Sequence, residues 1–263
     1  MDHCHYCWVF CPAFVPCRNC IKCVYCSIDC READDLHKLE CGCEQLETLS
    51  VEALLVLRLI TKFGVHAIQQ LKEKEPSFSS SSKDICESEI LQNAFNHFGS
   101  GISLTENQQL ANDAAICIII LFLEHKKLST TDERDVLVNF ISDLLVSLPA
   151  NIHGIGEMNI TKENIDNEEK AVGSIKSFGV GLYDKLSLAN HSCLPNFVRL
   201  NRGKEVVCIA SRRIRAGEEI NENYGMSSVA GHTREFRQRE LYQKYGFKCD
   251  CIVCEVVFFS FFG

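Results

Sequence analysis

The sequence predicts an α+β protein that binds zinc through cysteine-rich clusters near its two ends. Ten of the 17 cysteines lie in residues 1–43, and a CxCxxC motif ends at Cys254. Between these clusters, apolar residues recur at helical spacing over residues 48–148, and short β-like runs follow Pro149. With 263 residues, the chain is long enough for one large or two small domains.

Composition and charge restrict the functional class. Hydrophobic residues make up 46% of the chain and charged residues 24%, an ordinary balance for a globular protein with a core. The net charge of −8 argues against direct nucleic-acid binding, which usually needs a basic surface, and suits basic protein substrates. The longest strongly apolar run, Ile116–Leu123, is too short to span a bilayer, so no membrane segment is expected.

The cysteines are compatible with either a disulfide framework or metal sites. The N-terminus, Met1-Asp2-His3-Cys4, lacks the basic stretch and apolar run of a secretory signal. The cysteines also fall in CxxC, CxC and HxxxC patterns, which are typical of zinc ligands. Because thiolates in reducing compartments hold metal rather than pair, the sequence predicts a soluble intracellular zinc protein.

The middle of the chain is expected to be helical. Two helices are predicted at about 50–63 and about 106–127, and a third should begin at a capping box of Thr130 and Glu133. Between the first two, Pro76–Lys83 (PSFSSSSK) is expected to be an exposed loop. The third helix carries apolar residues at helical spacing: Val136, Leu137, Phe140, Ile141, Leu144, Leu145 and Leu148.

The rest of the chain is predicted to contain short strands and one helix. Phe197–Leu200 and Val206–Ala210 have strand patterns, and Asn201–Lys204 joins them as a hairpin turn. The polar stretch Thr161–Lys170 is expected to be a loop. An amphipathic helix at about 233–244 leads into the CxCxxC motif.

The N-terminal cluster contains eight candidate ligands, enough for two tetrahedral zinc ions. Cys26 and Cys30 are four residues apart, as are His37 and Cys41, so each pair would lie on one face of a short helix. A segment this short cannot bury an adequate core, so metal binding must supply its folding free energy. The ligands are Cys4, Cys7, Cys17, Cys20, Cys26, Cys30, His37 and Cys41.

This spacing, with the triplet Tyr25-Cys26-Ser27, resembles the MYND zinc finger. The resemblance leaves Cys11, Cys23 and Cys43 outside the ligand pattern, as free thiols. It also implies a proline-rich peptide as a partner of the finger. By the same resemblance the two sites interleave: one ion is held by Cys4, Cys7, Cys26 and Cys30, and the other by Cys17, Cys20, His37 and Cys41.

A second group of motifs runs from Gly179 to Cys254. Its order resembles the SET domain of protein-lysine methyltransferases and, with a MYND finger on the same chain, the SET and MYND domain-containing family. The resemblance is close over the finger and this group of motifs. In the middle of the chain it extends only to the helical pattern. The motifs are Asn190-His191-Ser192-Cys193-Leu194-Pro195-Asn196, Gly217-Glu218-Glu219-Ile220, Tyr224-Gly225, Phe247-Lys248 and the CxCxxC motif.

The resemblance implies S-adenosylmethionine as cofactor and a protein lysine as substrate. It assigns Asn190 and His191 to the cofactor, and Phe247 to the adenine, on which an aromatic ring stacks well. Tyr224 would line the lysine channel as the catalytic residue and also contact the cofactor's methyl group. Asn151 is a further candidate for cofactor binding. A third zinc ion, about three in all, would be held by Cys193, Cys249, Cys251 and Cys254.

The chemistry explains these residue types. A neutral lysine amine attacks a methyl group on a sulfonium in line, so charge moves from sulfur to nitrogen without being created. The enzyme therefore acts mainly by aligning the reactants, removing their water and excluding solvent. The third zinc would tie the segment with Phe247 to the Asn190–Cys193 segment, and so shape the cofactor pocket without taking part in the reaction.

The family pattern also implies missing parts. Its SET domain begins before the finger, with a GxG turn that cradles the cofactor, and Gly179-Val180-Gly181 occupies a later position. We therefore expect this chain to lack the N-terminal SET segment and the helical repeats after CxCxxC, and the abrupt apolar tail Val256–Phe262 to mark a truncation. An upstream coding sequence with strand patterns and a GxG in frame would identify a clipped gene model. Asn151–Gly154 lacks the aromatic residue common there in the family. The expected domains are a finger at 1–45, a helical insert at 46–150, a SET core at 151–228, a post-SET region at 229–256 and a tail at 257–263.

Two functions from different classes remain open. The first is an S-adenosylmethionine-dependent protein-lysine N-methyltransferase, or a truncated form of one, in the cytoplasm and nucleus. The second is a catalytically silent MYND adaptor that retains part of a SET fold as a scaffold. A purely structural zinc protein would leave the cofactor-type residues without a purpose.

Overall fold

The computed structural model divides by its contacts into two compact units, which are described one at a time. The predicted loop Pro76–Lys83 and the tail Val256–Phe262 lie outside the described residues. No helix in the described residues is both long enough and apolar enough to cross a membrane. The described residues are 3–73, 104–165, 168–183, 185–225 and 232–255.

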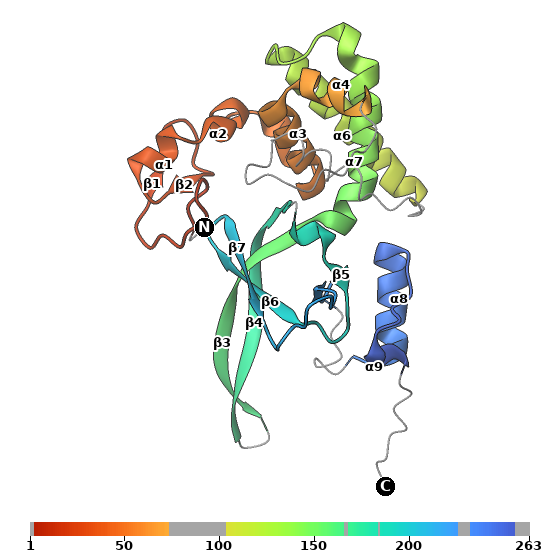
Figure 1. Ribbon diagram of the computed structural model, residues 1–263. Coiled ribbons are helices and arrows are strands. Elements are labelled where there is room, and N and C mark those ends of the chain that lie inside the picture. Colours follow the sequence, from red (N-terminus) through yellow and green to blue (C-terminus); the bar gives the residue numbers. More distant parts are fainter. Residues whose placement is uncertain (1–2, 74–103, 166–167, 184, 226–231, 256–263) are drawn as a thin grey trace. The chain divides into compact units, whose positions relative to one another are not determined.

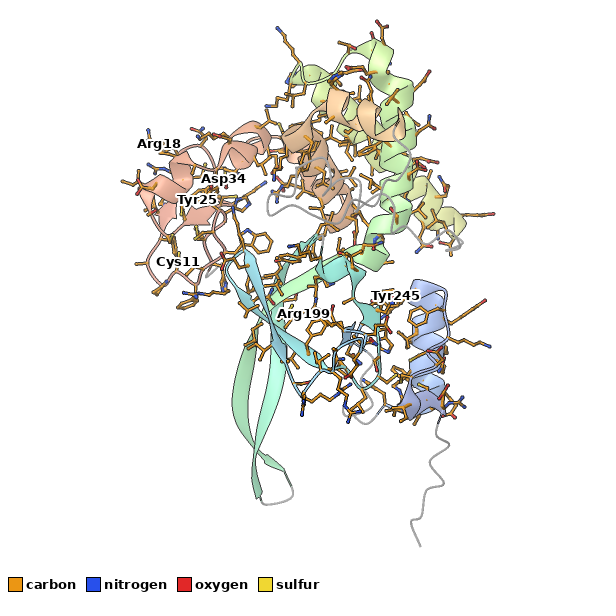
Figure 2. The ribbon with its side chains drawn as sticks, in the orientation of Figure 1. Cys11, Arg18, Tyr25, Asp34, Arg199 and Tyr245 are labelled. Carbon is orange, nitrogen blue, oxygen red and sulfur yellow. The ribbon has the colours of Figure 1, made fainter. Side chains whose placement is uncertain are left out.

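The first unit contains the start of the finger. Strands β1 (Val15–Pro16) and β2 (Val24–Tyr25) pair antiparallel, and helix α1 (Ile28–Glu32) follows them. Ser27 begins this helix as its N-cap, because its hydroxyl accepts a hydrogen bond from the Cys30 N–H at 3.1 Å. The side chain of Tyr25, labelled in Figure 2, is buried within the finger.

The same unit contains a long antiparallel ribbon, visible in Figure 1, of β3 (His153–Ile165) and β4 (Glu168–Gly181). The prediction of a loop at Thr161–Lys170 was wrong, because the backbone pairing extends to Ile165 opposite Glu168. A polar stretch without alternating apolar residues gives no strand signal. Here the strands are defined by backbone pairing, which sequence composition does not reveal.

The predicted hairpin is present as β6 (Phe197–Arg202) and β7 (Glu205–Ala210), each longer than expected. Gly203 lies in its turn with a φ of 59°, a left-handed conformation that favours glycine. A Cβ at Gly203 would lie 2.6 Å from the carbonyl oxygen of Cys7. Glycine therefore allows the finger backbone and this turn to approach closely within the first unit.

Trp8 packs against the ribbon at Gly179. A Cβ at Gly179 would lie 2.0 Å from Cζ3 of the indole ring, so the absence of a side chain makes the contact possible. Next to it, the rings of His3 and Phe178 stack with centroids 4.1 Å apart. The finger segment and the ribbon of the first unit therefore share an aromatic contact.

Replacing Gly179 by alanine is expected to displace Trp8 and destabilise this unit by about 1–3 kcal/mol, as overpacking does. Because Trp8 is the single tryptophan of the chain and is half-buried, its fluorescence emission should shift to the red. The matched control is Gly154→Ala, whose Cβ would meet only the Ser177 Oγ at 3.7 Å. Equal emission spectra for the two variants would contradict the packing described.

The second unit contains the predicted helices as α3 (Val51–Phe63), α6 (Glu106–His125) and α7 (Arg134–Asn151), which pack together with α4 (Val65–Glu73), as Figure 1 shows. The helices are amphipathic, and their apolar faces form the core of this unit. Fully buried residues of these faces are Val56, Leu57, Ile60, Ile119, Leu123, Leu137, Phe140, Ile141, Leu144 and Leu148.

Capping explains where these helices begin. The predicted capping box at Thr130 is confirmed: its backbone N–H and hydroxyl both bond the Glu133 carboxylate, at 2.8 and 3.0 Å. A short 3₁₀ turn, η2 (Thr131–Glu133), then leads into α7. The α6 helix begins with an equivalent box formed by Thr105 and Gln108.

The second unit also holds the end of the finger and the C-terminal elements. Helix α2 (Asp35–Glu40) is tied to α3 by Arg58, which donates two hydrogen bonds to the Glu40 carboxylate at 2.8 and 2.7 Å. The two-residue strands β5 (Asn190–His191) and β8 (Asn221–Glu222) pair in parallel. The remaining elements are η1 (Glu44–Thr48), η3 (Leu186–Leu188), α8 (Arg234–Tyr245) and α9 (Ile252–Glu255).

Helix α8 confirms the helix predicted at about 233–244. It begins at the N-cap Thr233, whose hydroxyl accepts from the Phe236 N–H at 3.3 Å, and ends at Gly246 in the left-handed conformation with a φ of 75°. The chain then turns directly into the CxCxxC segment. The end of α8 at Gly246 therefore sets where the CxCxxC segment begins.

Candidate functional site

The first group of ligand atoms lies within the first unit. The sulfurs of Cys4, Cys7, Cys26 and Cys30 lie within 4.8 Å of one another. The Cys7 and Cys26 sulfurs are 3.6 Å apart, and those of Cys26 and Cys30 are 3.5 Å apart. Four thiolates around a tetrahedral zinc ion, with Zn–S bonds of about 2.3 Å, would lie about 3.8 Å apart. The arrangement therefore fits zinc.

Local backbone structure positions these thiols. The Cys4 N–H donates to the Val9 carbonyl at 3.0 Å, and the Trp8 N–H donates to the Cys4 carbonyl at 2.8 Å, which forms a tight turn around Cys7. Burial raises the pKa of the Cys4 thiol, but hydrogen bonds from backbone groups outweigh this and lower it to about 7. A thiol with that pKa provides a thiolate ligand readily.

The second group consists of Cys17, Cys20, His37 and Cys41, whose ligand atoms also lie within 4.8 Å of one another. Asp34 caps α2 by accepting from the His37 N–H at 3.1 Å, so His37 lies in the first turn of that helix. The Cys41 N–H donates to the His37 carbonyl at 2.7 Å, as expected for residues four apart at a helix end. This set of three thiols and an imidazole is a common zinc ligand set.

Two of the three cysteines that the finger pattern leaves out, Cys11 and Cys23, are buried, and Cys43 is half-buried. None of the cysteines in the described residues forms a disulfide. Cysteine in such a position packs as a small apolar side chain.

The third group lies in the second unit and consists of Cys193, Cys249, Cys251 and Cys254, again within 4.8 Å. The Cys193 sulfur is 3.5 Å from that of Cys254 and 3.9 Å from that of Cys249. Cys193, Cys249 and Cys254 are buried, so this site is closed to solvent on most sides. Four thiols with this spacing fit a structural zinc ion, which needs all four positions filled by protein.

Helix α8 holds the third group from one side. Gln238 donates to the Cys249 carbonyl at 2.6 Å and accepts from the Cys249 N–H at 3.0 Å. Arg237, next to it, donates through Nε to the Cys193 sulfur at 3.2 Å and through Nη2 to the Cys254 sulfur at 3.6 Å. Sequence reasoning missed both residues, because a polar helix carries no sign of which side chains turn inward.

The pairing of β5 with β8 brings His191 next to Tyr224. The Ser192 N–H donates to the Glu222 carbonyl at 2.8 Å, which fixes the register of the two strands. Asn196 reinforces it, because its carboxamide donates to the Glu219 carbonyl at 2.8 Å and accepts from the Asn221 N–H at 3.0 Å. Segments that are about thirty residues apart in the sequence are thereby locked side by side.

The hydrogen bonds of His191 determine its tautomer. Its Nδ1 accepts from the Tyr224 backbone N–H at 3.1 Å, so the proton of the neutral ring lies on Nε2. Nε2 lies 3.4 Å from the Cys193 sulfur, to which it can donate. Burial, assisted by the positive charge of Arg237 and opposed by Glu222, lowers the pKa of His191 to about 4. The ring is therefore neutral at physiological pH and links Tyr224 to the third group.

Tyr224 is held at both its backbone and its hydroxyl. The hydroxyl donates to the Ala189 carbonyl at 2.7 Å. Burial and the nearby Glu222 raise the pKa of Tyr224 to about 12, with smaller contributions from Tyr245 and Glu219. The phenol is therefore neutral at physiological pH and acts as a hydrogen-bonding group, not as a base.

Aromatic rings surround Tyr224. Its centroid lies 4.9 Å from that of Tyr245, labelled in Figure 2, and 6.4 Å from that of Phe247, which it meets edge to face. The Phe247 centroid lies 6.1 Å from the His191 ring. The structure thus brings together three residues predicted for the cofactor region and adds Tyr245, which the sequence analysis did not select.

The other two predicted cofactor residues are already hydrogen-bonded. The exposed Asn190 donates to the Glu219 carboxylate at 2.6 Å, and its side chain remains accessible. Asn151 is buried at the end of α7, where its carboxamide donates to the Ser147 carbonyl at 2.9 Å. Its backbone carbonyl accepts from the Ser187 hydroxyl at 3.1 Å, which connects α7 to the start of η3.

A SET domain profile matches residues 62–225, more than half of the chain. The chain belongs to the SET domain family. The matched region begins inside α3 and ends directly after Tyr224, so it includes β5, β8 and Cys193. The other three thiols of the third group and Phe247 follow it.

Curated relatives place the chain within the SET and MYND domain-containing branch of this family. A Xenopus laevis protein named N-lysine methyltransferase SMYD2-B is 23% identical over 263 residues, which are 96% of this chain and 51% of that protein. The Homo sapiens N-lysine methyltransferase SMYD2 is 23% identical over 268 residues, 96% of this chain and 50% of that protein. The Mus musculus histone-lysine N-methyltransferase SMYD3 is 41% identical over 81 residues, 31% of this chain and 18% of that protein. The chain spans about half the length of the SMYD2 relatives.

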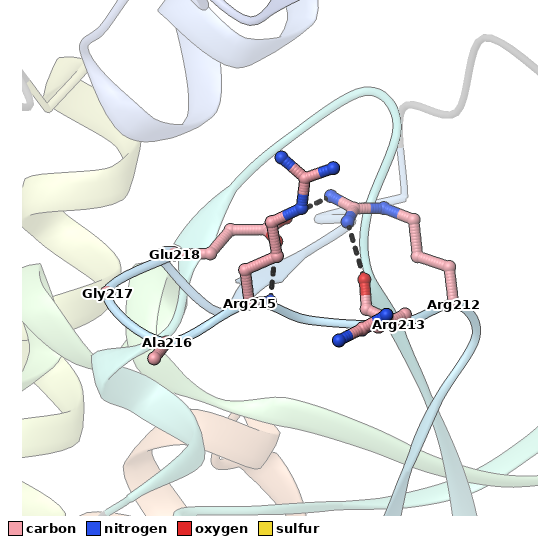
Figure 3. A pocket seen from close by; sticks show the side chains of 6 residues that line it. All are labelled: Arg212, Arg213, Arg215, Ala216, Gly217 and Glu218. Atoms are coloured by element: carbon pink, nitrogen blue, oxygen red, sulfur yellow. Dashed lines mark hydrogen bonds and ion pairs between the residues drawn. The ribbon is translucent and has the colours of Figure 1, made fainter.

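A separate hollow lies on the surface of the SET domain, and Figure 3 shows it. Its volume is about 590 Å³, and it is open to solvent. Arg212 forms an ion pair with Glu218 at 2.5 Å, and the Arg215 N–H donates to the same carboxylate at 3.0 Å. This charge pairing lowers the pKa of Glu218 to about 2. The lining residues are Arg212, Arg213, Arg215, Ala216, Gly217 and Glu218.

Proposed function

We propose that this chain is an S-adenosylmethionine-dependent protein-lysine N-methyltransferase, or the part of one that carries Tyr224. The observation that carries the proposal is the link from Tyr224 through His191 to a mostly buried group of four thiols, of which Cys193 lies in the matched SET region. Membership of the family implies S-adenosylmethionine as the cofactor, and the aromatic rings next to His191 offer a face suited to adenine.

Tyr224 is proposed to position the lysine amine. S-Adenosylmethionine, when bound, supplies an activated methyl group. The proton of the neutral Tyr224 hydroxyl is donated to the Ala189 carbonyl, so the phenol oxygen can accept a hydrogen bond from the amine N–H, which suits orienting an uncharged amine. Because the hydroxyl is held by a single hydrogen bond of 2.7 Å, its position is set before any substrate binds.

The remaining predicted residues are proposed to bind the cofactor. Phe247 offers a half-buried ring for the adenine, and Asn190 an accessible carboxamide. His191 supports them by fixing Tyr224. Asn151 is proposed to contribute to cofactor binding indirectly. Its carboxamide already bonds within α7, but its backbone carbonyl accepts a hydrogen bond from Ser187.

The two zinc groups of the finger are proposed to be structural, because four protein ligands leave no open position on the metal. We propose a proline-rich peptide as the partner of the finger and a basic protein as the methylated substrate, in keeping with the net charge of −8. The many described cysteines that form no disulfide suit the reducing environment of cytoplasm and nucleus.

Calorimetric titration of the 263-residue chain with S-adenosylmethionine tests the enzyme proposal. We expect binding, and we expect Phe247→Ala to weaken it by about 1–3 kcal/mol, the usual contribution of a base stacked on an aromatic ring. The matched control is Phe236→Ala on α8, whose ring stacks on His232. No binding at millimolar cofactor would overturn the proposal for this chain, and equal losses in the two variants would remove Phe247 from the cofactor site.

A silent adaptor is the second candidate. It is favoured by the two complete ligand groups of the finger, whose folding needs metal but no cofactor. This candidate predicts that a proline-rich peptide binds the zinc-loaded chain, whereas S-adenosylmethionine does not. The same titration therefore separates the two functions.

A further inference from the structure

We propose that Arg237 is a positioning residue of the zinc site formed by the third group of thiols. It is a buried cation that holds two of the ligand sulfurs. Its guanidinium donates to the sulfurs of Cys193 and Cys254, at 3.2 and 3.6 Å. The proposal deepens the proposed function, since it concerns the zinc site that braces Tyr224, but it does not depend on methyl transfer.

Burial makes the charge of Arg237 significant. The residue is 4% exposed, although arginine rarely leaves solvent without a partner. Its third contact is from Nη1 to the His232 carbonyl at 2.6 Å, so the planar group is held in one orientation. The chain thus places a fixed positive charge directly against a group of thiols in the interior of the second unit.

Charge balance explains what this cation does. Zinc brings two positive charges to four thiolates, which leaves two negative charges in excess within a buried site. Uncompensated buried charge is unfavourable, and a hydrogen-bonded cation offsets part of it. Hydrogen bonds in which one partner is charged are also stronger than neutral ones. Arg237 therefore offsets part of the excess negative charge that the zinc-loaded site would carry at Cys193 and Cys254.

The neighbouring residues give the interaction a defined geometry. Gln238, the next residue of α8, holds the backbone of Cys249 through two hydrogen bonds. Two adjacent side chains of one helix thus contact three of the four ligands: one through the sulfurs and the other through the backbone. Partners of this kind outside the ligand shell typically change metal affinity by about 10–100-fold.

Cysteine alkylation under chelator challenge tests the proposal. The zinc-loaded chain is incubated with EDTA and N-ethylmaleimide, and the labelling rate of each cysteine is measured by peptide mass spectrometry. In Arg237→Met we expect the third group to be labelled about 10–100-fold faster than in the wild type. Arg237→Lys, which keeps the charge but cannot reach both sulfurs with a planar fork, should show an intermediate rate.

The finger cysteines of the first group serve as the internal reference, and their labelling rate should stay unchanged. The matched control is Arg239→Met, because Arg239 lies on the same helix with its side chain 60% exposed. If Arg237→Met labels every cysteine quickly, the chain has unfolded and the lysine variant decides the question. In that case, the proposal is overturned if the third group of Arg237→Lys is labelled at the same rate as in the wild type.

Two further results would also overturn it. One is that the third group in Arg237→Met is labelled as slowly as in the wild type. The other is an increase in the labelling rates of the third group and of the finger cysteines by the same factor in Arg237→Lys. Arg237 would then only support the fold, through its hydrogen bond to the His232 carbonyl. Failure of the enzyme proposal gives a different result, namely no cofactor binding with the labelling pattern intact.

Discussion

Tyr224→Phe is expected to lower the rate of lysine methylation by about 100-fold, the loss typical of a reacting group that is no longer held in line. The substitution removes the hydroxyl that donates to the Ala189 carbonyl at 2.7 Å. The ring and its contacts with Tyr245 and Phe247 remain, so the free energy of unfolding should fall by only about 1 kcal/mol. Mass spectrometry of a lysine peptide incubated with protein and cofactor measures the rate.

Tyr242→Phe is the matched control, because Tyr242 on α8 is exposed and outside the aromatic cluster. It should methylate at the wild-type rate. Zinc content and circular dichroism should be the same for both variants. If the wild type and Tyr224→Phe transfer methyl groups at the same rate, Tyr224 has no part in the mechanism.

Cys193→Ser is expected to remove one zinc ion selectively and to abolish cofactor binding. Loss of a partner outside the ligand shell typically weakens metal binding by about 10–100-fold, so loss of a ligand should exceed that. The His191 ring would also lose the sulfur next to its Nε2, and with it part of what holds Tyr224. Zinc content by native mass spectrometry and binding of S-adenosylmethionine by calorimetry measure the two effects.

Cys117→Ser is the control for the cysteine variant, because Cys117 is an exposed residue of α6 outside the three groups of thiols. It should keep all its zinc and its cofactor binding. The account of the third group is contradicted if Cys193→Ser retains the full zinc content. It is also contradicted if the zinc is lost while cofactor binding is unchanged, because the site would then not brace the cofactor residues.

The sequence contained enough information to group the metal ligands. Cysteine and histidine at CxxC, CxxxC and HxxxC spacing have few other uses, so the spacing identified the finger ligands. The resemblance to the MYND finger and the SET domain then assigned twelve positions to the three groups that the structure brings together. The capping box at Thr130 and the apolar spacing likewise predicted α3, α6, α7 and α8 to within a few residues. Local signals of this kind act within one or two helical turns, so one sequence is sufficient to read them.

Features that depend on pairing between distant segments could not be predicted from the sequence. The Thr161–Lys170 stretch is polar, and its strands follow from backbone pairing within the ribbon. Nothing marked Arg237 as buried, because an arginine in a polar helix usually faces solvent. The tautomer of His191 likewise depends on the Tyr224 N–H, which a parallel strand pair brings to it from thirty-three residues away.

The zinc content of the purified 263-residue chain tests the central claim most directly. Native mass spectrometry, compared with the denatured mass, should show three zinc ions per chain, two from the finger and one from the third group. A folded chain that carries no metal, with its cysteines oxidised in pairs, would contradict the account.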